Sequence, residues 1–318
     1  MVEHHTLQAN PETVAWGYWD ATRGPVLRIN SGDQVTLHSI SGEPKDLPTD
    51  PVLVAPEQFE IHARCERGPG PHFLTGPIWV NDAEPGDTLE VRIIDIQLRD
   101  AWGWNLIQPL LGTLPEDFPN RRHLVLPIDR DARIATLPWG TDIMLEPFFG
   151  NFGVAPPTNY GRITSTIPRE HGGNLDNKDL VSGTTTYFPI WNHGALFSAG
   201  DGHAVQGHGE VCLTAIETGM IGTFELIVRK DLKLKFPRAE SPTHLISMGL
   251  NEDLDDAAKQ ALREMIEWII ELTDLSREDA YTLCSLAGDL YVTQLVDVNK
   301  GVHCKLPKAL LQRSSLIP

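Results

Sequence analysis

The stretch PVLRINSGDQVTLHSI (residues 25–40) decides the fold class of this chain, because apolar and polar residues alternate along it in steps of two. That period is typical of β-strands with one buried face. A second stretch, DTLEVRIIDIQL (87–98), repeats the pattern. The triplets SGD (31–33) and PGD (85–87) each introduce a strand, since glycine accepts positive φ and aspartate bonds nearby backbone in a turn.

The rest of the first three quarters of the chain has the same β-rich character. Residues 137–177 are rich in glycine, proline and aromatics and have no sustained helical period, so we expect ordered loops and short strands that line a cavity. Strand character returns over 207–236, where VCLTAIET (211–218) and TFELIVRKDLKLKF (223–236) alternate apolar and polar residues.

Helical patterns are confined to the C-terminal part. Apolar residues recur at three- and four-residue steps from Asp253 to about Glu271, which predicts an amphipathic helix. Ser276 with Asp279 resembles a capping box that begins a second helix, running through Ala280 to Leu286. Strands first and helices last predict a mainly β fold of sandwich or barrel-like form, with a β-rich core over 1–236 and a smaller α/β subdomain over 237–318 packed on it.

Composition limits the partners. The chain has 26 basic and 43 acidic residues and a formal net charge of −17, which disfavours nucleic acid and anionic membrane surfaces. Its four cysteines include no CxxC pair, so we expect free thiols in a reducing compartment. An N-terminal signal pattern and an apolar run of about 18 residues are both missing from the sequence, so we expect a soluble, cytoplasmic protein.

The densest group of potential metal ligands lies between residues 200 and 210, where Asp201, His203, His208 and Glu210 alternate with glycines. Carboxylate oxygen and imidazole nitrogen are the usual donors for a catalytic divalent ion. The glycines would let a loop fold tightly around such an ion. In the alternative interpretation the carboxylates cap turns and the histidines face solvent.

Three other segments are candidates for the same site. In the segment 171–179 an ordinary Asx turn is the alternative to a role for Asn174 or Asp176 near the ion. His72 stands between two prolines and would be rigid if it lined the pocket, but a structural histidine is the common alternative. His303 lies either near the pocket or at a subunit contact.

The segment GALFS (194–198), followed by Gly-Asp-Gly-His and Gly-Glu-Val-Cys, closely resembles the signature of the acetamidase/formamidase family. Other segments resemble that family in the same order along nearly the whole chain: GPHFLTGPI (70–78), EPGDTLEV (84–91), FFGNFGVAPP (148–157), GGNLDNKDL (172–180), RAESPTHLISMGL (238–250) and QLVDVNKGVHCKLPKAL (294–310).

The resemblance implies a cytoplasmic, homo-oligomeric enzyme that binds a divalent metal and hydrolyses short aliphatic amides such as formamide and acetamide to carboxylate and ammonia. It places Asp201, His203 and Glu210 in the functional loop and makes Asp176 a further ligand. The family pattern has aspartate where this chain has His208, which leaves the role of that position open.

Our hypothesis is that Asp176, Asp201 and His203 hold the ion, with zinc expected, while Glu210 and His203 act in catalysis. His72, Asn174 and His208 are the expected substrate contacts.

One rival mechanism is a nucleophilic amidase, but the sequence has no GxSxG elbow, and Cys212 is expected inside an apolar strand. A cupin-like metal enzyme and a non-catalytic small-molecule binding protein are the alternatives from other classes.

Overall fold

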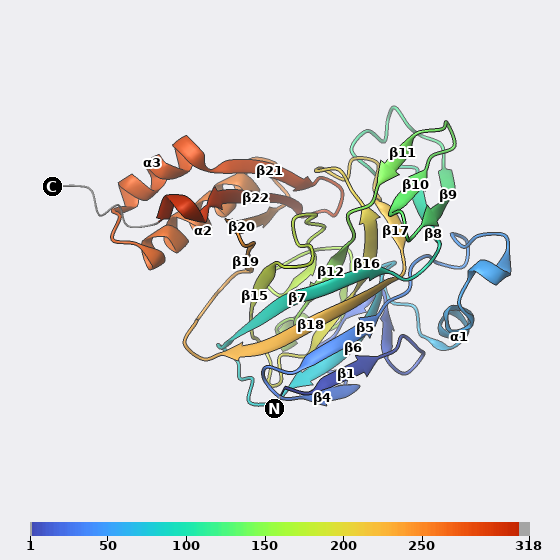
Figure 1. Ribbon diagram of the computed structural model, residues 1–318, viewed down its shortest axis with the longest axis horizontal. Coiled ribbons are helices and arrows are strands. Elements are labelled where there is room, and N and C mark those ends of the chain that lie inside the picture. Colours follow the sequence, from blue (N-terminus) through green and yellow to red (C-terminus); the bar gives the residue numbers. More distant parts are fainter. Residues whose placement is uncertain (1, 312–318) are drawn as a thin grey trace.

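The computed structural model describes residues 2–311 and shows two large β-sheets with two α-helices at the C-terminal end (Figure 1). Strands make up 39% of the chain and helices 16%, which confirms the mainly β prediction. The sheets form a sandwich-like arrangement rather than a closed barrel within this described range. None of the helices in residues 2–311 has the length and apolar character needed to cross a membrane.

The first sheet has nine strands and contains the strands that follow both predicted Gly-Asp turns. In spatial order its strands are β1 (His4–Leu7), β5 (Gln34–His38), β18 (Met220–Arg229), β7 (Thr88–Leu98), β15 (Thr185–Pro189), β19 (Arg238–Glu240), β20 (His244–Asn251), β22 (Lys300–Pro307) and β21 (Asp289–Gln294). The two Gly-Asp turns precede β5 and β7 as predicted. In each, the aspartate accepts a backbone hydrogen bond from three residues back, Asn30 to Asp33 and Glu84 to Asp87.

The second sheet has eleven strands and carries most of the candidate site. Its main path is β11 (Asp142–Met144), β10 (Ile134–Thr136), β9 (Arg122–Asp129), β8 (Trp102–Ile107), β17 (Ile216–Thr218), β16 (Phe197–Val205), β12 (Phe148–Gly153) and β14 (Gly172–Asn174). Strand β6 (Phe73–Val80) also pairs with β16, and with β2 (Val14–Trp16) and β4 (Leu27–Ile29). A small separate sheet joins β3 (Tyr18–Trp19) and β13 (Ile163–Thr164).

Aromatic side chains from both sheets form the core between them. Phe224 of the first sheet contacts three phenylalanines of the second in ring pairs whose centroids lie 5.3–6.5 Å apart: Phe149, Phe152 and Phe197. All four are at most 1% exposed. Burial on this scale contributes about 1.5–3 kcal/mol per large apolar side chain, so the sandwich is a rigid frame for the site.

The helices match the predictions. Helix α2 (Leu254–Leu272) begins after Asp253, whose side chain caps it, and α3 (Arg277–Ala287) begins after the Ser276 cap. Both pack on the C-terminal strands of the nine-stranded sheet, around a second apolar cluster. Because the sheet continues from β15 into β19 without a break, the division at residue 236 stays a prediction. The remaining helices are α1 (Pro56–Arg64), η1 (Pro51–Leu53), η2 (Thr158–Tyr160) and η3 (Lys308–Leu311).

Two predicted strands are shorter than expected. Residues 206–215 form a loop, and β17 begins only at Ile216. The prediction that Cys212 lies inside an apolar strand is therefore wrong, and its half-buried thiol lies 3.7 Å from the Thr214 carbonyl oxygen. Strand β18 likewise ends at Arg229, and two lysines beyond it form ion pairs instead of extending the strand. Lys230 and Lys233 each bind Asp87 at 2.6 Å.

The prediction of free thiols is confirmed, while the reducing compartment stays a prediction. None of the four cysteines, all within residues 2–311, forms a disulfide.

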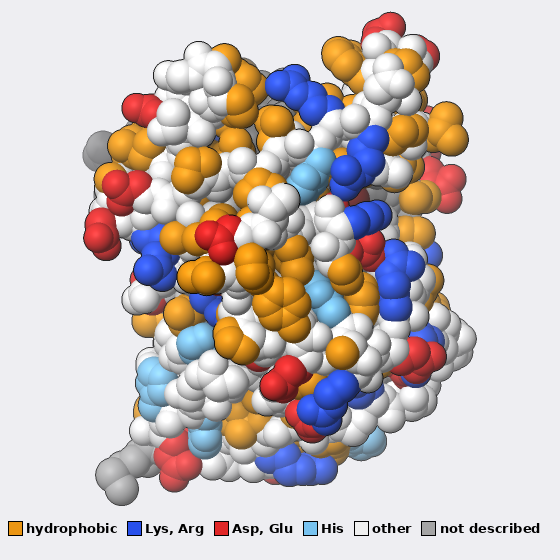
Figure 2. Space-filling view, turned by 90° about the vertical axis from the view of Figure 1, so that its right-hand side faces the viewer, with side chains coloured by type: hydrophobic (Ala, Val, Ile, Leu, Met, Phe, Trp, Pro, Cys, Tyr) orange, Lys and Arg blue, Asp and Glu red, His pale blue; other side chains and the backbone are white. Residues whose placement is uncertain are grey.

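Figure 2 views the side of the molecule that faces right in Figure 1, and acidic and basic side chains are interspersed there between hydrophobic ones.

Candidate active site

A cavity of about 290 Å³ opens beside β16, and several buried acidic residues and histidines line it. Those relevant to chemistry are His72, Asn174, Asp201, His203, Glu210, Glu217 and Asp297. Asp176 lies against His203 and is 1% exposed. The cavity thus brings together residues from five separate parts of the chain.

The local sequence Gly200-Asp201-Gly202-His203 places its two polar side chains on one face of β16. Side chains alternate between the faces of a strand, so Asp201 and His203 point the same way. The two glycines leave room for close packing on the opposite face of the strand. A Cβ on Gly200 would lie 1.9 Å from the Phe73 carbonyl oxygen, and one on Gly202 would lie 2.2 Å from Met220 Cγ. The expected tight loop at Asp201 and His203 is therefore wrong, since close packing in a strand requires these two glycines.

Strand register adds the next residues. His203 pairs with Glu217 of β17 on one side and with Phe148 of β12 on the other. The Phe148 ring lies edge-on to the imidazole, with centroids 5.0 Å apart. Asp176 arrives from the loop after β14, Glu210 from the loop after β16, and Asp297 from the connection between β21 and β22.

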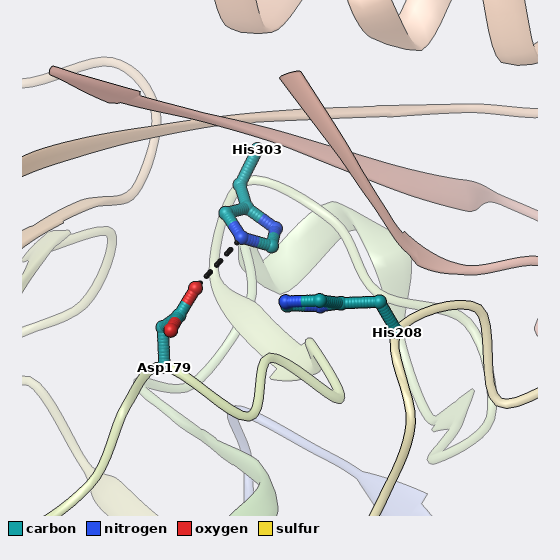
Figure 3. A group of neighbouring side chains, drawn as sticks. All are labelled: Asp179, His208 and His303. Carbon is teal, nitrogen blue, oxygen red and sulfur yellow. Dashed lines mark hydrogen bonds and ion pairs between the residues drawn. The ribbon is translucent and has the colours of Figure 1, made fainter. Parts of the chain in front are cut away.

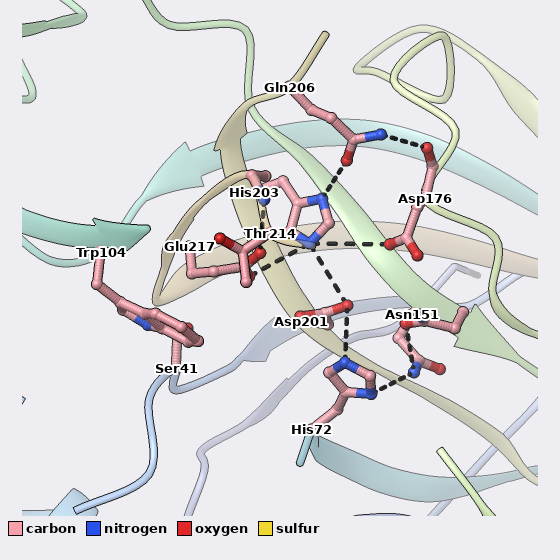
Figure 4. Close-up of polar contacts among 12 residues, drawn as sticks. Ser41, His72, Trp104, Asn151, Asp176, Asp201, His203, Gln206, Thr214 and Glu217 are labelled. Atoms are coloured by element: carbon pink, nitrogen blue, oxygen red, sulfur yellow. Dashed lines mark hydrogen bonds and ion pairs between the residues drawn. The ribbon is translucent and has the colours of Figure 1, made fainter. Parts of the chain in front are cut away.

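His203 is the hub of the site (Figure 4). Its Nε2 lies 3.2 Å from Glu217 Oε2, 3.5 Å from Asp201 Oδ2 and 3.8 Å from Asp176 Oδ1. Its Nδ1 lies 2.8 Å from Gln206 Oε1, while the Gln206 amide donates to the Asp176 carbonyl. Because Gln206 Oε1 can only accept, His203 carries hydrogen on Nδ1, and Nε2 is directed at the carboxylates.

Three of these carboxylate residues have strained backbones. Asp176, Asp201 and Glu210 have φ values of 47°, 58° and 45°, in the left-handed region that favours glycine. Such conformations cost about 1–3 kcal/mol each and gather at functional sites, where the surrounding structure enforces them. The folded state is therefore less stable than it would be without this strain, and the strained backbones direct the three side chains into one site.

A second wall of the cavity is polar and neutral. His72 Nε2 lies 3.7 Å from Asp201 Oδ2, and its Nδ1 lies 2.9 Å from Ser165 Oγ. The Asn151 amide donates to Asn174 Oδ1 at 2.9 Å, which fixes the orientation of Asn174. Burial lowers the pKa of His72 more than the Asp201 carboxylate raises it, so this imidazole is neutral at neutral pH.

Burial and mutual repulsion raise the pKa values of four carboxyl groups. The pKa of Asp176 lies well above the usual range because of burial and the neighbouring Glu210 and Asp297, and the pKa of Glu210 does so because of burial, Asp297 and Glu217. Burial likewise raises the pKa values of Glu217 and Asp297 to about 7. In the absence of a cation these groups retain protons.

Asp201 and His203 form the ionised pair of the cluster. Burial raises the pKa of Asp201, but the neighbouring His72 and His203 imidazoles and the hydrogen bonds from His203 and Glu217 outweigh it and hold that pKa below its usual value. Burial lowers the pKa of His203, but Glu217 and Asp201 outweigh it and hold that pKa well above the usual value.

Unpaired oxygen atoms show that the donor set fits a divalent cation. Both Asp176 carboxylate oxygens, Glu210 Oε2 and Asp297 Oδ2 are buried without a hydrogen-bond partner among the described residues. No lysine or arginine within residues 2–311 forms an ion pair with the five carboxyl groups. Among these described residues their cationic partner is His203, while His72 faces Asp201 as a neutral imidazole. Buried carboxylates of this kind are normally paired or bind a metal. Two overlapping groups have ligand atoms within 4.8 Å of one another: Asp201–His203–Glu217 and Asp176–His203–Glu210.

Most residues predicted from the sequence meet here, with one exception. Asp176, Asp201, His203, Glu210, His72 and Asn174 all belong to the site. His208, expected as a substrate contact, instead lies beside Tyr291 and His303, with ring centroids 4.9 and 5.2 Å away, and it does not line this cavity. Glu210 lines both this cavity and the neighbouring groove, whereas His208 lines the groove alone, so closeness in sequence did not bring both residues to the cavity.

Two residues of the site were missed. Glu217 looked like an ordinary polar position in an alternating strand, and only its register with His203 reveals it. Asp297 lies in the connection between β21 and β22, and its local sequence carries no metal-ligand pattern. Glu217 is 4% exposed in the structure. A carboxylate beside apolar residues in a predicted strand is the local sequence signal for such a buried position.

The raised pKa values predict how the metal-free protein responds to pH. A carboxyl group whose pKa is higher in the folded protein than in the unfolded chain stabilises the fold below its unfolded pKa, and that contribution is lost as pH rises through the folded value. Glu217 and Asp297 therefore favour the metal-free fold at about pH 5 and oppose it at about pH 8. We expect the Tm of the metal-free protein to fall over this interval by on the order of 5 °C.

Thermal denaturation after chelation and dialysis measures this effect. Adding zinc should raise the Tm most at the alkaline end, because the ligands are then deprotonated. A Tm that rises from about pH 5 to about pH 8 in the metal-free protein would contradict the burial of several protonated carboxyls.

Comparison with known proteins places the chain. The model of the Acetamidase/Formamidase family matches residues 69–165 and 159–313. A formamidase of Methylophilus methylotrophus is 28% identical over 252 residues, an alignment that covers 59% of this chain and 61% of that protein. The chain thus spans less than two thirds of the length of this curated relative.

Solved structures match over almost the full length. The crystal structure of an acetamidase from Bacillus halodurans superposes with a TM-score of 0.83 and 31% identity, covering 98% of this chain and 100% of that one. An acetamidase from Yersinia enterocolitica gives a TM-score of 0.86 and 27% identity, covering 98% and 94% of the two chains. With the family model matching well over half of its residues, this chain belongs to the Acetamidase/Formamidase family.

Proposed function

We propose that this chain hydrolyses small amides, with formamide and acetamide as first candidates, to a carboxylate and ammonia, and that it uses a divalent metal. The observation that carries the proposal is the hub at His203, where one imidazole nitrogen faces three buried carboxylates at the wall of an open cavity. Membership of the family, whose relatives include a formamidase and acetamidases, supports the reaction class.

The residues that would hold the metal are Asp176, Asp201 and His203, together with Glu217. Three or four oxygen and nitrogen donors with room for water suit a catalytic zinc ion, which we propose as the metal. A bound divalent ion polarises an amide carbonyl and lowers the pKa of a bound water from 15.7 to about 7.

Glu210 is the residue we assign to proton transfer. It lines the cavity, is 6% exposed, and its pKa is raised by burial and by neighbouring carboxylates. A carboxylate with a raised pKa can accept a proton from attacking water and return it to the departing amine near neutral pH. Amide hydrolysis needs both steps, because the unprotonated amine is a poor leaving group.

His72 and Asn174 are suited to orient the amide. Both line the cavity, and both are held by hydrogen bonds to Ser165 or Asn151 before any ligand binds. A neutral imidazole and a carboxamide can offer a donor and an acceptor to an amide group without adding charge. Such preorganisation lowers the entropy lost when the substrate is positioned.

The rival mechanisms have less support. The Cys212 thiol lies outside the cavity, in a neighbouring groove, and contacts Asn105 and the Thr214 carbonyl. Because Cys212 does not line the cavity that holds the hub, a covalent thioester formed in that cavity is disfavoured. A cupin-like metal enzyme or a non-catalytic binding protein would release no ammonia from an amide.

An ammonia assay across formamide, acetamide, propionamide and an aryl amide tests the proposal, combined with metal analysis of the purified protein. We expect ammonia release that is lost on chelation, returns with zinc, and survives a thiol-alkylating reagent. Activity that survives chelation and disappears on alkylation would reverse the assignment. No ammonia from any amide would leave a binding protein as the better conclusion.

Glu210→Gln should separate proton transfer from metal binding. The substitution keeps the size of the side chain and removes its proton-accepting carboxylate. We expect kcat to fall by on the order of 100- to 10,000-fold with the metal content retained. The acidic limb of the pH profile of kcat should also disappear.

Glu267→Gln is the matched control, because Glu267 is exposed on α2 and pairs with Arg277. It should leave the metal content and the pH profile unchanged. Loss of the metal from Glu210→Gln would instead make Glu210 a ligand.

A further inference from the structure

A second cluster of metal-binding residue types lies outside the active-site cavity (Figure 3). It consists of Asp179, His208 and His303, whose potential ligand atoms all lie within 4.8 Å of one another. Asp179 follows β14, His208 belongs to the loop after β16, and His303 lies on β22. Three segments far apart in the sequence therefore converge at one point, and in Figure 3 the carboxylate and both rings face the same small space.

Neighbouring side chains hold two of the three groups in a ligand-ready orientation. Thr293 Oγ1 lies 2.7 Å from His303 Nδ1, which leaves His303 Nε2 directed at Asp179 Oδ2, 2.9 Å away. Lys305 Nζ binds the other Asp179 oxygen, Oδ1, at 2.9 Å. Outer contacts of this kind fix the tautomer and the orientation of metal ligands. Lys305 thus binds Oδ1, while Oδ2 faces His303 Nε2 on the side where the ion would lie.

His208 has no comparable protein partner. Its Nδ1 is buried and accepts or donates no hydrogen bond among the described residues. Its ring packs on Tyr291 and His303, with centroids 4.9 and 5.2 Å away. An aromatic packing role alone would be filled by phenylalanine, without the cost of burying an unpaired ring nitrogen. The polar atom therefore points to a ligand.

We propose that Asp179, His208 and His303 form a second site for a divalent transition metal, with zinc as the ion that suits the donors. Two imidazole nitrogens and one carboxylate oxygen, with water in the fourth position, are a set that zinc takes in proteins where the chain supplies three ligands. Tetrahedral coordination at about 2.0–2.1 Å places the donors about 3.3–3.4 Å from one another. His303 Nε2 and Asp179 Oδ2, now 2.9 Å apart, would therefore move slightly apart as the ion replaces the hydrogen bond between them.

An ion in this second site would stabilise the two loops that carry Asp176 and Glu210 of the active site. Asp179 lies three residues after Asp176, and His208 lies two residues before Glu210. An ion at this position would join both active-site loops to β22, in the C-terminal part of the nine-stranded sheet. Such a tie helps to maintain the strained backbones of Asp176 and Glu210. This role is independent of the reaction that the neighbouring cavity carries out.

Cobalt titration of the metal-free protein tests the proposal by stoichiometry and by the visible spectrum of the bound ion. The key variant is His208→Phe, which keeps the aromatic contacts with Tyr291 and removes both nitrogens. We expect about two cobalt ions per wild-type chain and about one in this variant, with affinity at the second site lowered at least roughly 100-fold. Asp201→Asn, which removes a ligand of the first site, should lose the other ion and keep the spectrum of this one.

A control excludes adventitious binding by surface histidines. His193→Asn removes an exposed imidazole that pairs with Glu84, and it should bind as much cobalt as the wild type. Circular dichroism and the Tm of the metal-free variants check that each is folded. Equal stoichiometry and identical spectra in wild type and a folded His208→Phe would overturn the proposal, as would an Asp201→Asn protein that binds no ion. A chain without amidase activity would leave this result unaffected.

Discussion

Replacing Asp201 with asparagine is expected to abolish both ammonia release and metal binding at the His203 hub. Asp201 Oδ2 lies between the two histidines, 3.5 Å from His203 Nε2 and 3.7 Å from His72 Nε2. It is also the one carboxyl of the cluster whose pKa is lowered, so it provides a fixed negative charge even before an ion arrives. Asparagine has nearly the same shape and no charge.

The expected size of the effect follows from what the ion supplies. A catalytic metal contributes several kcal/mol of transition-state stabilisation, and loss of about 4 kcal/mol corresponds to roughly 1,000-fold in rate. We therefore expect kcat/KM for the best amide to fall by on the order of 1,000-fold or more. Metal content measured by mass spectrometry should fall with it.

Asp33→Asn is the control for loss of a buried carboxylate as such. Asp33 is 3% exposed and accepts backbone hydrogen bonds in the turn before β5, outside the cavity. Its replacement should lower the Tm and leave kcat/KM and the metal content of the folded protein unchanged. If Asp201→Asn kept its metal and its rate, the hub would not be the reactive centre.

The fold class could be predicted because its signals are local. Alternation in residues 25–40 and 87–98, and the caps Asp253 and Ser276, act through neighbours within a few positions. The strand predicted over 211–218 forms only at 216–218, because the alternation over 211–215 also suits a loop. Leu213 and Thr214 line the cavity and Asn105 binds the Thr214 and Ala215 carbonyls, so tertiary contacts override the pattern.

The candidate site was only partly predictable, for a related reason. Asp201, His203 and Glu210 are close in sequence, so their density alone was a signal. Glu217 reaches the hub through its pairing with His203 in the β16–β17 register, and Asp297 reaches it from a connection almost 100 residues further along the chain. Neither contact can be read from the residues that neighbour Glu217 or Asp297 in the sequence. His208 shows the converse limit, because closeness in sequence to Glu210 did not bring His208 to the cavity that Glu210 lines.

Gly150→Ala is the second change for which we expect a large effect. It tests whether the site requires a residue without a side chain at this position of β12. A Cβ at this position would lie 2.4 Å from Asp176 Oδ1, 2.8 Å from Asp201 Oδ2 and 2.8 Å from His203 Cε1. All three distances are shorter than real contacts allow, and all three atoms belong to residues proposed to hold the ion. One methyl group must therefore displace several ligands at once.

Displacement of catalytic groups by about 1 Å can cost on the order of 100-fold in rate, and we expect kcat to fall by about that amount together with metal affinity. Gly207→Ala is the matched control, since Gly207 lies on the neighbouring loop with open space where its Cβ would stand. It should keep wild-type kcat and metal content. Both variants gain the same methyl group, so a difference between them isolates the contact with the hub. A Gly150→Ala protein with full activity and full metal content would show that the ion binds away from Asp176, Asp201 and His203.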